Sequence, residues 1–168
     1  MGHPVVVVMG VSGCGKTTVG ELLAEKTGWP FLDADALHAS ESIAKMAVGI
    51  PLTDADRRPW LDRVAGWIRD RYAAGEPGVV ACSALKRAYR DRLRTADSDL
   101  RFVYMKADRE TLADRLAHRR GHFFAPRLLA AQLADLDEPA ADEHPIVIDI
   151  GQSPEAEVDT VLTALGQP

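Results

Sequence analysis

The strongest constraint on the fold is the stretch GVSGCGKT at residues 10–17, which follows a run of four valines and a methionine. It matches the pattern G-x-x-x-x-G-K-[ST] at every fixed position. The β-branched run predicts a buried parallel strand, and the apolar spacing after the stretch predicts a helix over residues 16–26. A glycine-rich turn in that place aims backbone N–H groups and the positive end of a helix at an anion. The stretch therefore predicts a phosphate-binding loop, with a purely structural glycine turn as the alternative.

The residues of this loop predict a nucleoside triphosphate and its metal ion. Lys16 is placed to reach the β- and γ-phosphates, and the hydroxyl of Thr17 is placed to bind Mg²⁺. The sequence has no N-K-x-D element of the kind that reads guanine, and its strand at 79–82 runs into Ser83 rather than an aspartate. Asp33, at the end of the second strand, is the candidate to support the metal. We therefore expect ATP and Mg²⁺ as cofactors.

Strand patterns alternate with helical patterns along the whole chain. The strands are expected at 4–9, 31–32, 79–82, 102–105 and 146–150, and the helices at 16–26, 40–48, 54–74, 85–93, 110–117, 127–136 and 154–165. This alternation predicts an α/β fold of the P-loop NTPase type, a three-layer sandwich with a central parallel sheet and a small lid. We expect one domain over residues 1–168, with the lid around 119–127. Thr53 is the expected N-cap of the helix at 54–74. Two tryptophans in the apolar stripe of that helix, Trp60 and Trp67, are interpreted as core residues.

Charge and cysteine content narrow the class of protein. The net charge of -5 argues against a large nucleic-acid surface, and no apolar run is long enough to span a membrane. The start of the chain lacks the basic region of a signal peptide. Two cysteines, Cys14 and Cys82, have no pattern of a disulfide framework or metal site. We therefore expect reduced thiols, a cytoplasmic location and no nucleic-acid or membrane partner.

Two aspartates separated by a single residue mark the expected acceptor site. Asp33 and Asp35 follow the second strand, at the edge of the sheet where α/β proteins bind ligands. One could support Mg²⁺ through water while the other accepts the proton of an attacking hydroxyl. The alternative is a pair of loop aspartates that cap turns.

Basic side chains surround this pair in the sequence. Arg57 and Arg58 lie in the first turn of a helix, where cations are mildly unfavourable, so they suggest either an anionic partner or salt bridges to nearby aspartates. Lys86 and Arg90 follow Ser83 after the next strand, and a solvated basic face is their alternative reading. A basic pocket around two acids suits an acidic polyol better than a nucleobase.

The cluster RRGH at residues 119–122 has the composition of a mobile lid. Gly121 offers a hinge, and the arginines could close on the transferring phosphoryl group. An ordinary surface loop is the alternative.

The chain resembles the gluconokinase family of small P-loop kinases, which is related to shikimate kinase. The residues that carry the resemblance run from Met9 to Pro139 and comprise MGVSGCGKT, FLDAD followed by LH, KMAVGIPLTDADRRPWL, CSALKRAYRDRLR, RRGHFF and QLADLDEP. The resemblance implies transfer of the ATP γ-phosphate to the 6-hydroxyl of D-gluconate, and a homodimer. A kinase for another small hydroxy acid such as shikimate, and a non-catalytic nucleotide-binding module, are the alternatives.

The resemblance also implies a role for each site residue. The nucleotide would be bound by Gly10, Ser12, Gly13, Cys14, Gly15, Lys16, Thr17, Thr18, Gln152 and Pro154. The metal would be held by Thr17 and Asp33. Gluconate would be bound by Asp35, His38, Arg58, Ser83, Lys86, Arg90, His122 and Gln132. Catalysis would depend on Lys16, Asp35, Arg119 and Arg120, with Asp35 as the base.

Overall fold

The fold is built on a parallel five-stranded sheet in the part of the chain that the computed structural model describes, residues 4–118 and 126–167. The strand order is β2-β3-β1-β4-β5. The strands are β1 (Val5–Met9), β2 (Phe31–Asp33), β3 (Gly78–Ala81), β4 (Arg101–Lys106) and β5 (Ile146–Asp149). Strand β1 lies in the centre, where Val7 is in register with Val80 of β3 and Phe102 of β4.

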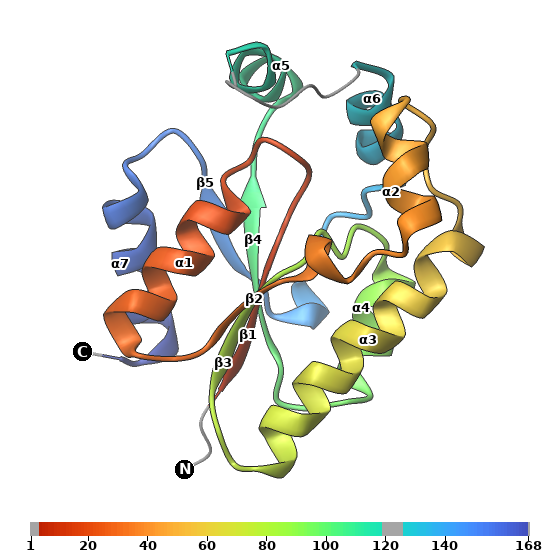
Figure 1. Cartoon of the computed structure of the whole chain (residues 1–168). Helices are drawn as coiled ribbons and strands as arrows, with labels where there is room; N and C mark the ends of the chain where they lie inside the picture. The colour runs from red at the N-terminus through yellow and green to blue at the C-terminus, as the bar shows by residue number, and fades with distance from the viewer. Residues whose placement is uncertain (1–3, 119–125, 168) are drawn as a thin grey trace.

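Helices cover both faces of this sheet. They are α1 (Lys16–Thr27), α2 (Ser40–Ala47), α3 (Asp54–Ala73), α4 (Arg87–Arg94), α5 (Arg109–Ala117), α6 (Pro126–Asp135) and α7 (Pro154–Leu165), with two short 3₁₀ turns, η1 (Ala34–Leu37) and η2 (Ala141–Glu143). Helices α1 and α7 lie on one side of the sheet, and α3 and α4 lie on the other (Figure 1). The predicted three-layer α/β fold is confirmed.

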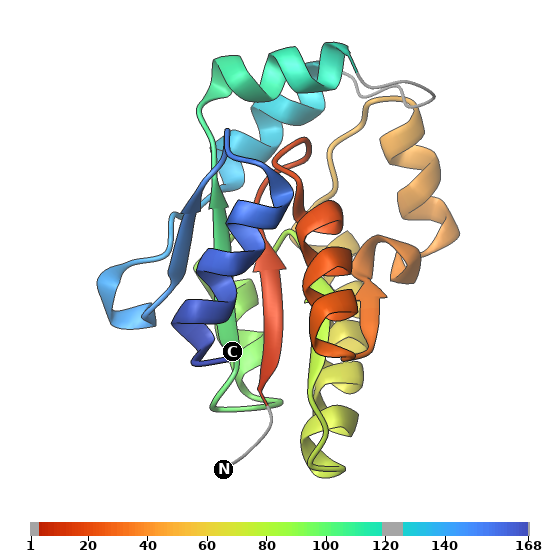
Figure 2. The same cartoon turned by 90° about the vertical axis from the view of Figure 1, so that its left-hand side faces the viewer.

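The alternation of side chains along β1 divides the core into two halves. Val5, Val7 and Met9 pack with α3 and α4, whereas Val6 and Val8 pack with α1 and α7. All five are fully buried, because a central parallel strand has helices against both of its faces. Figure 2 shows the sheet between its helical layers after a quarter turn.

The carboxyl ends of the strands form the functional edge of the sheet. The glycine-rich loop leaves β1 there, η1 follows β2, and helices α2, α5 and α6 lie beyond this edge (Figure 1). From β1 the chain crosses first to β2 at one edge of the sheet and later passes to β4 and β5 on the other side of β1, and this reversal opens a crevice beside β1. The sequence pattern placed both Asp33 and the glycine-rich loop at this edge, and the structure confirms it.

Helix α3 begins with a reciprocal cap. The Thr53 hydroxyl accepts from the backbone N–H of Asp56, and the Asp56 carboxylate accepts from the backbone N–H of Thr53. These bonds satisfy two groups that a helix start leaves unpaired. Thr53 was the predicted cap, and the expected burial of Trp60 is also confirmed, at 2% exposure.

Most boundaries lie within one residue of those expected from sequence, and the start of α4 differs by two. The helix expected from Leu85 begins at Arg87, because Ala84 adopts a positive φ of 45° and Leu85 and Lys86 remain extended or irregular. The strand expected to end at Ile150 ends at Asp149. Over the described ranges 4–118 and 126–167, no helix combines the length and apolar character needed to cross a bilayer.

Candidate active site

The glycine-rich loop forms a cradle at the start of α1. Gly13 and Gly15 have positive φ values of 87° and 95°. A residue with a side chain would adopt this backbone conformation only at a cost in free energy. Gly10 is also constrained, because a Cβ there would lie 2.7 Å from the Cys14 sulfur. Helix α1 begins at Lys16, so its positive end faces the loop. The geometry matches the phosphate-binding loop that the sequence predicted.

Two adjoining hollows open at this cradle. The smaller, about 260 Å³, is called the phosphate hollow below. It is lined by Gly13 and Gly15 of the loop together with Thr17, Thr18 and Arg115. The larger, about 480 Å³, is lined by side chains from five parts of the chain and is called the acceptor cleft below. Ser12, Lys16 and Asp35 line both hollows. A group bound in one therefore lies next to a group bound in the other.

The predicted acid pair lies in the acceptor cleft. Asp33 and Asp35 both line it, and the Asp33 carboxylate accepts from the backbone N–H of Asp35 at 3.0 Å. The side chain of Asp35 is 71% exposed, so its carboxylate faces open space. Asp33 thus has the turn-capping role that was its alternative reading, while it also lies at the cleft wall.

His38 lies beside Asp35 and is held against Trp60. Its Nε2 atom is 4.0 Å from an Asp35 oxygen, and its ring stacks on the Trp60 ring with centroids 4.4 Å apart. Burial lowers the pKa of His38, although the charge of Asp35 acts in the opposite direction. The imidazole is therefore neutral near pH 7.

The structure distinguishes the two adjacent arginines of α3. Arg57 lines the acceptor cleft, whereas Arg58 is exposed and does not line it. Arg57 donates at 3.0 Å both to the Tyr89 hydroxyl and to the Asp135 carboxylate of α6. Of the two, Arg57 is therefore the arginine at the wall of the acceptor cleft.

Two further predicted contacts lie away from the cleft. Lys86 donates to Asp54 at 2.8 Å and does not line the cleft. Arg90 is fully buried, and its guanidinium donates to both oxygens of Glu143 and to the carbonyls of Ala84 and Leu85. Because these bonds occupy the guanidinium, we leave Arg90 out of the proposed site and assign it a structural role.

Ser83 and Gln132 lie where the sequence placed them, at the acceptor cleft. The Gln132 carboxamide oxygen accepts from the Ser12 backbone N–H at 2.8 Å, and its nitrogen donates to the Ser12 hydroxyl at 3.2 Å. The Ser83 carbonyl accepts from the backbone N–H of Gly10. Both residues therefore support the phosphate-binding loop from the acceptor side.

Sequence reasoning missed Arg115 of α5. It lines the phosphate hollow, and its guanidinium lies 3.5 Å from the Gly13 carbonyl. In the sequence it was one of several basic residues near the end of a helix, and nothing in its spacing set it apart. Only the position of α5 over the loop brings it to the site (Figure 1).

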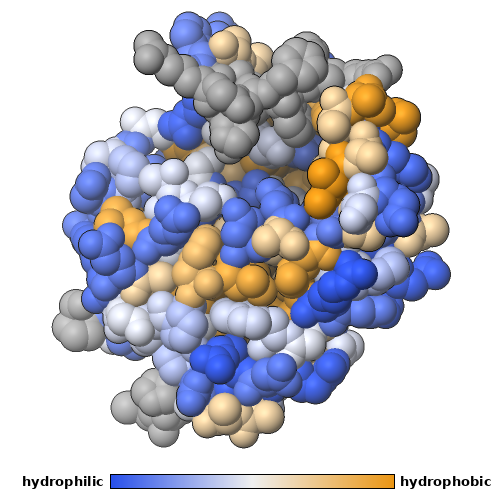
Figure 3. Space-filling model, viewed as in Figure 1, coloured by the Kyte–Doolittle hydropathy of each residue, from blue (hydrophilic) through white to orange (hydrophobic). Residues whose placement is uncertain are grey.

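The apolar wall of the acceptor cleft was also missed. Ile43 and Met46 of α2 line it together with Pro51 and Leu52. Some of this apolar surface continues outside, since Ile43, Val48 and Ile50 are exposed. Figure 3 shows apolar side chains gathered over α2, and a second apolar stretch crosses the middle of the same face.

Several predicted residues fall elsewhere. Arg119, Arg120 and His122 lie outside the described residues, so the expected lid contacts are not described. Gln152 and Pro154 precede and begin α7, and neither lines the phosphate hollow or the acceptor cleft.

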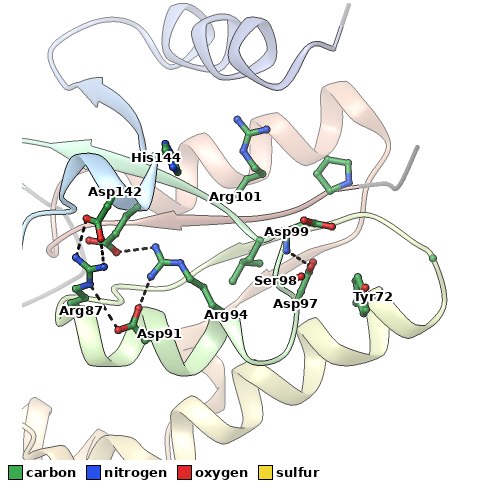
Figure 4. A pocket seen from close by; sticks show the side chains of 14 residues that line it. Tyr72, Arg87, Asp91, Arg94, Asp97, Ser98, Asp99, Arg101, Asp142 and His144 are labelled. Carbon is green, nitrogen blue, oxygen red and sulfur yellow. Dashed lines mark hydrogen bonds and ion pairs between the residues drawn. The ribbon is translucent and has the colours of Figure 1, made fainter.

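A third hollow, about 690 Å³, lies at the opposite end of the strands, near Pro4 and Arg101. Its charged side chains largely pair with one another (Figure 4). Arg94 bonds to Asp91 at 2.9 Å and to Glu143 at 2.8 Å. None of the predicted site residues lines this hollow, and its ion pairs join α4 to the turn before β5.

The oxygen donors of the phosphate hollow and the acceptor cleft fit a nucleotide with Mg²⁺. Mg²⁺ prefers oxygen ligands and keeps several waters, so one hydroxyl and one or two carboxylates suffice. Thr17 lines the phosphate hollow, Asp33 lines the acceptor cleft and Asp35 lines both. Among the described residues no cluster of three or more His, Cys, Asp or Glu side chains could hold a metal without such help.

The sheet is parallel, a phosphate-binding loop follows its central strand, and an acid-lined cleft lies beside that loop. These features together define a P-loop kinase for small molecules. The family model described as an AAA domain matches residues 5–139. The gluconokinase of Gluconobacter oxydans (strain 621H) is 48% identical over 160 residues, which are 95% of this chain and 88% of that protein. This chain belongs to the gluconokinase family.

Solved structures agree with this assignment. A sugar kinase from Janibacter sp. HTCC2649 superposes with a TM-score of 0.92 at 46% identity, covering 98% of this chain and 95% of that one. A gluconokinase from Sinorhizobium meliloti 1021 superposes with a TM-score of 0.88 at 45% identity, covering 97% and 91%. The family resemblance inferred from the sequence motifs is thus confirmed.

Proposed function

We propose that this protein is a gluconokinase that transfers the γ-phosphate of ATP to the 6-hydroxyl of D-gluconate. The observation that carries the proposal is Asp35, whose carboxylate lines both the phosphate hollow and the acceptor cleft. A hydroxyl beside that carboxylate would lie next to the end of a triphosphate in the cradle. The names of the relatives support gluconate as the acceptor.

Phosphoryl transfer depends chiefly on positioning and on charge stabilisation. Lys16, which lines both hollows, would neutralise charge on the oxygens of the transferring group. Asp35 would accept the proton of the attacking hydroxyl as the new oxygen–phosphorus bond forms, and the bond from the γ-phosphorus to the β–γ bridging oxygen breaks to release ADP. Arg115, at the phosphate hollow, adds a second positive charge near the cradle.

Arg57 is the proposed contact for the carboxylate of gluconate. It is the arginine that lines the acceptor cleft, and a guanidinium can bind a carboxylate through two parallel hydrogen bonds. Asp35 lies near the cradle and Arg57 lies elsewhere on the same cleft. An acidic polyol could therefore place a hydroxyl at Asp35 and its carboxylate at Arg57. His38 and Ser83 line the same cleft and could bind hydroxyls.

Mg²⁺ is proposed as the metal, held by Thr17 and by Asp33 through water. When bound, it would supply positive charge that offsets the charge of the phosphate groups. Arg119, Arg120 and His122 are kept as proposed lid contacts, and Gln152 and Pro154 as proposed adenine contacts, on the family resemblance alone. A homodimer and a cytoplasmic location are proposed on the same basis.

A coupled ADP-release assay over a panel of acids tests the acceptor. We expect turnover to depend on D-gluconate and to exceed that with shikimate or other sugar acids. A Lys16→Ala variant provides the blank for contaminating kinases. A preference for another acid would replace gluconate as the acceptor, and ATP binding without stimulation by any acid would favour the non-catalytic module.

A further inference from the structure

We propose that Trp60 and Arg63 are positioning residues that hold the turn carrying Asp35. The inference rests on the proposed function in one respect, namely that Asp35 acts as the base. It assigns to one face of α3 a role beyond core packing, since residues three apart on a helix lie on the same side. Arg57, which lines the acceptor cleft, precedes Trp60 by the same spacing.

Two hydrogen bonds from α3 reach the turn η1 on either side of Asp35. The Trp60 indole N–H donates to the carbonyl of Ala34 at 2.7 Å in a buried position. A guanidinium N–H of Arg63 donates to the carbonyl of Leu37 at 2.6 Å. The backbone is therefore held one residue before Asp35 and two residues after it.

A ring contact adds a third restraint. The His38 ring lies nearly parallel to the Trp60 ring, at an interplanar angle of 12°. Among the described residues, no group forms a hydrogen bond to the buried Nδ1 of His38. The Nε2 atom of the same ring lies 4.0 Å from an Asp35 oxygen. The stack thus holds the imidazole beside the Asp35 carboxylate.

The restraints act on the backbone because the Asp35 side chain is itself largely exposed, at 71%. A carboxylate in open space depends on its main chain for direction, and the placement of a base within a fraction of an ångström affects the rate strongly. Trp60 is buried and also lines the acceptor cleft, so by itself it would be explained by core packing or by contact with a bound acceptor. Arg63 is exposed, however, so its bond to Leu37 serves the turn rather than the core.

Substitutions at the exposed and the buried positions test the proposal separately. Arg63→Met removes the donor and keeps the stem, whereas Arg63→Lys keeps a donor. Trp60→Phe removes the N–H and keeps an aromatic ring for His38. Two substitutions on the same helix serve as controls, Trp67→Phe and Arg69→Met. The Trp67 side chain packs near Gly78, and Arg69 is exposed. Each variant is compared with the wild type by kcat, by KM for ATP and by thermal midpoint.

We expect Arg63→Met and Trp60→Phe to lower kcat by about tenfold or more while KM for ATP changes by less than about twofold. Arg63→Lys should recover most of the lost rate, and both controls should keep it. The proposal is overturned if Arg63→Met keeps the wild-type kcat, or if the control variants lose as much rate. Should Trp60→Phe fail to fold, the Arg63 variants decide the test by themselves.

The assay uses whichever acceptor the wild-type enzyme phosphorylates fastest. A different acceptor would therefore overturn gluconate as the substrate and leave the positioning test intact. Asp35→Asn is measured in parallel. If it keeps the wild-type rate, Asp35 is not the base, and the positioning role falls with it.

Discussion

Gln132 of α6 and Ser12 of the phosphate-binding loop are joined by two hydrogen bonds across 120 positions of sequence. The carboxamide binds both the backbone N–H and the hydroxyl of Ser12, so it fixes the loop where the two hollows meet. Replacing Gln132 with leucine removes both bonds and keeps a similar volume. A net contribution of about 1 kcal/mol for each bond predicts a fall in kcat/KM of roughly tenfold or more.

Steady-state kinetics with ATP and gluconate varied in turn would check this prediction. Gln132→Glu is the matched control, because its carboxylate still accepts from the Ser12 N–H. A kcat/KM for Gln132→Leu equal to that of the wild type would show that the loop holds its shape without α6.

Asp35→Asn tests the proposed base. The amide keeps the size of the side chain but cannot accept a proton, so kcat should fall by about a hundredfold or more. ATP affinity should stay close to that of the wild type, because the cradle is built from the loop after β1. Rapid-quench or steady-state rates, with ATP binding followed by calorimetry, provide the measurement. Near-normal kinetics in this variant would remove Asp35 from the role of base.

Arg57 and Arg58 form a matched pair on adjacent positions of α3. Arg57 lines the acceptor cleft and Arg58 does not. A charged hydrogen bond to a substrate carboxylate contributes roughly 1.5–3 kcal/mol, so Arg57→Met should raise KM for gluconate by about ten- to a hundredfold. Arg58→Met should change it by less than about twofold. Equal effects of both variants, with both proteins folded by circular dichroism, would contradict the assignment.

Glu143 provides a test of stability against pH. Burial alone would raise its pKa, but hydrogen bonds from Arg90 and Arg94 outweigh this and bring the pKa from an ordinary 4.5 down to about 2. A carboxyl whose pKa is lower in the folded state stabilises the fold above its unfolded pKa. This stability should therefore be present above about pH 4.5 and be lost as the pH falls toward about 2. The side chain is only 2% exposed, so solvent screens the pair little.

Urea unfolding of wild type and Glu143→Gln at several pH values would check this. We expect a difference in the free energy of unfolding of about 2–3 kcal/mol at neutral pH that shrinks below pH 4.5. A difference that is constant from pH 7 to pH 3 would show that the ion pair with Arg90 and Arg94 does not carry the effect.

The sequence predicted the architecture because local patterns decide it. The valine run at β1, the glycine loop and the Thr53 cap each have one favourable local conformation, and all three occur as expected. The acid pair was placed correctly for a related reason: both residues follow a strand, and parallel strands end at a common edge. Expectations of this kind need no knowledge of how distant segments pack.

The sequence could not place side chains whose neighbours come from distant segments. Arg90 looked like a cleft residue because it follows a strand end, but Glu143 lies within 2.7 Å of it and binds it in the core. The choice between Arg57 and Arg58 depended on the rotation of α3 about its axis. Arg115 came to the phosphate hollow only through the placement of α5. No spacing rule along the chain carries that information.

The position of the transferred phosphate decides whether the enzyme is a gluconate 6-kinase. Phosphorus and carbon NMR of a reaction of the wild-type enzyme with ATP, Mg²⁺ and D-gluconate would identify the product. We expect ADP together with a phosphate ester at the 6-hydroxyl of gluconate, formed in equal amounts. Release of inorganic phosphate without a gluconate ester, or an ester at another hydroxyl, would contradict it.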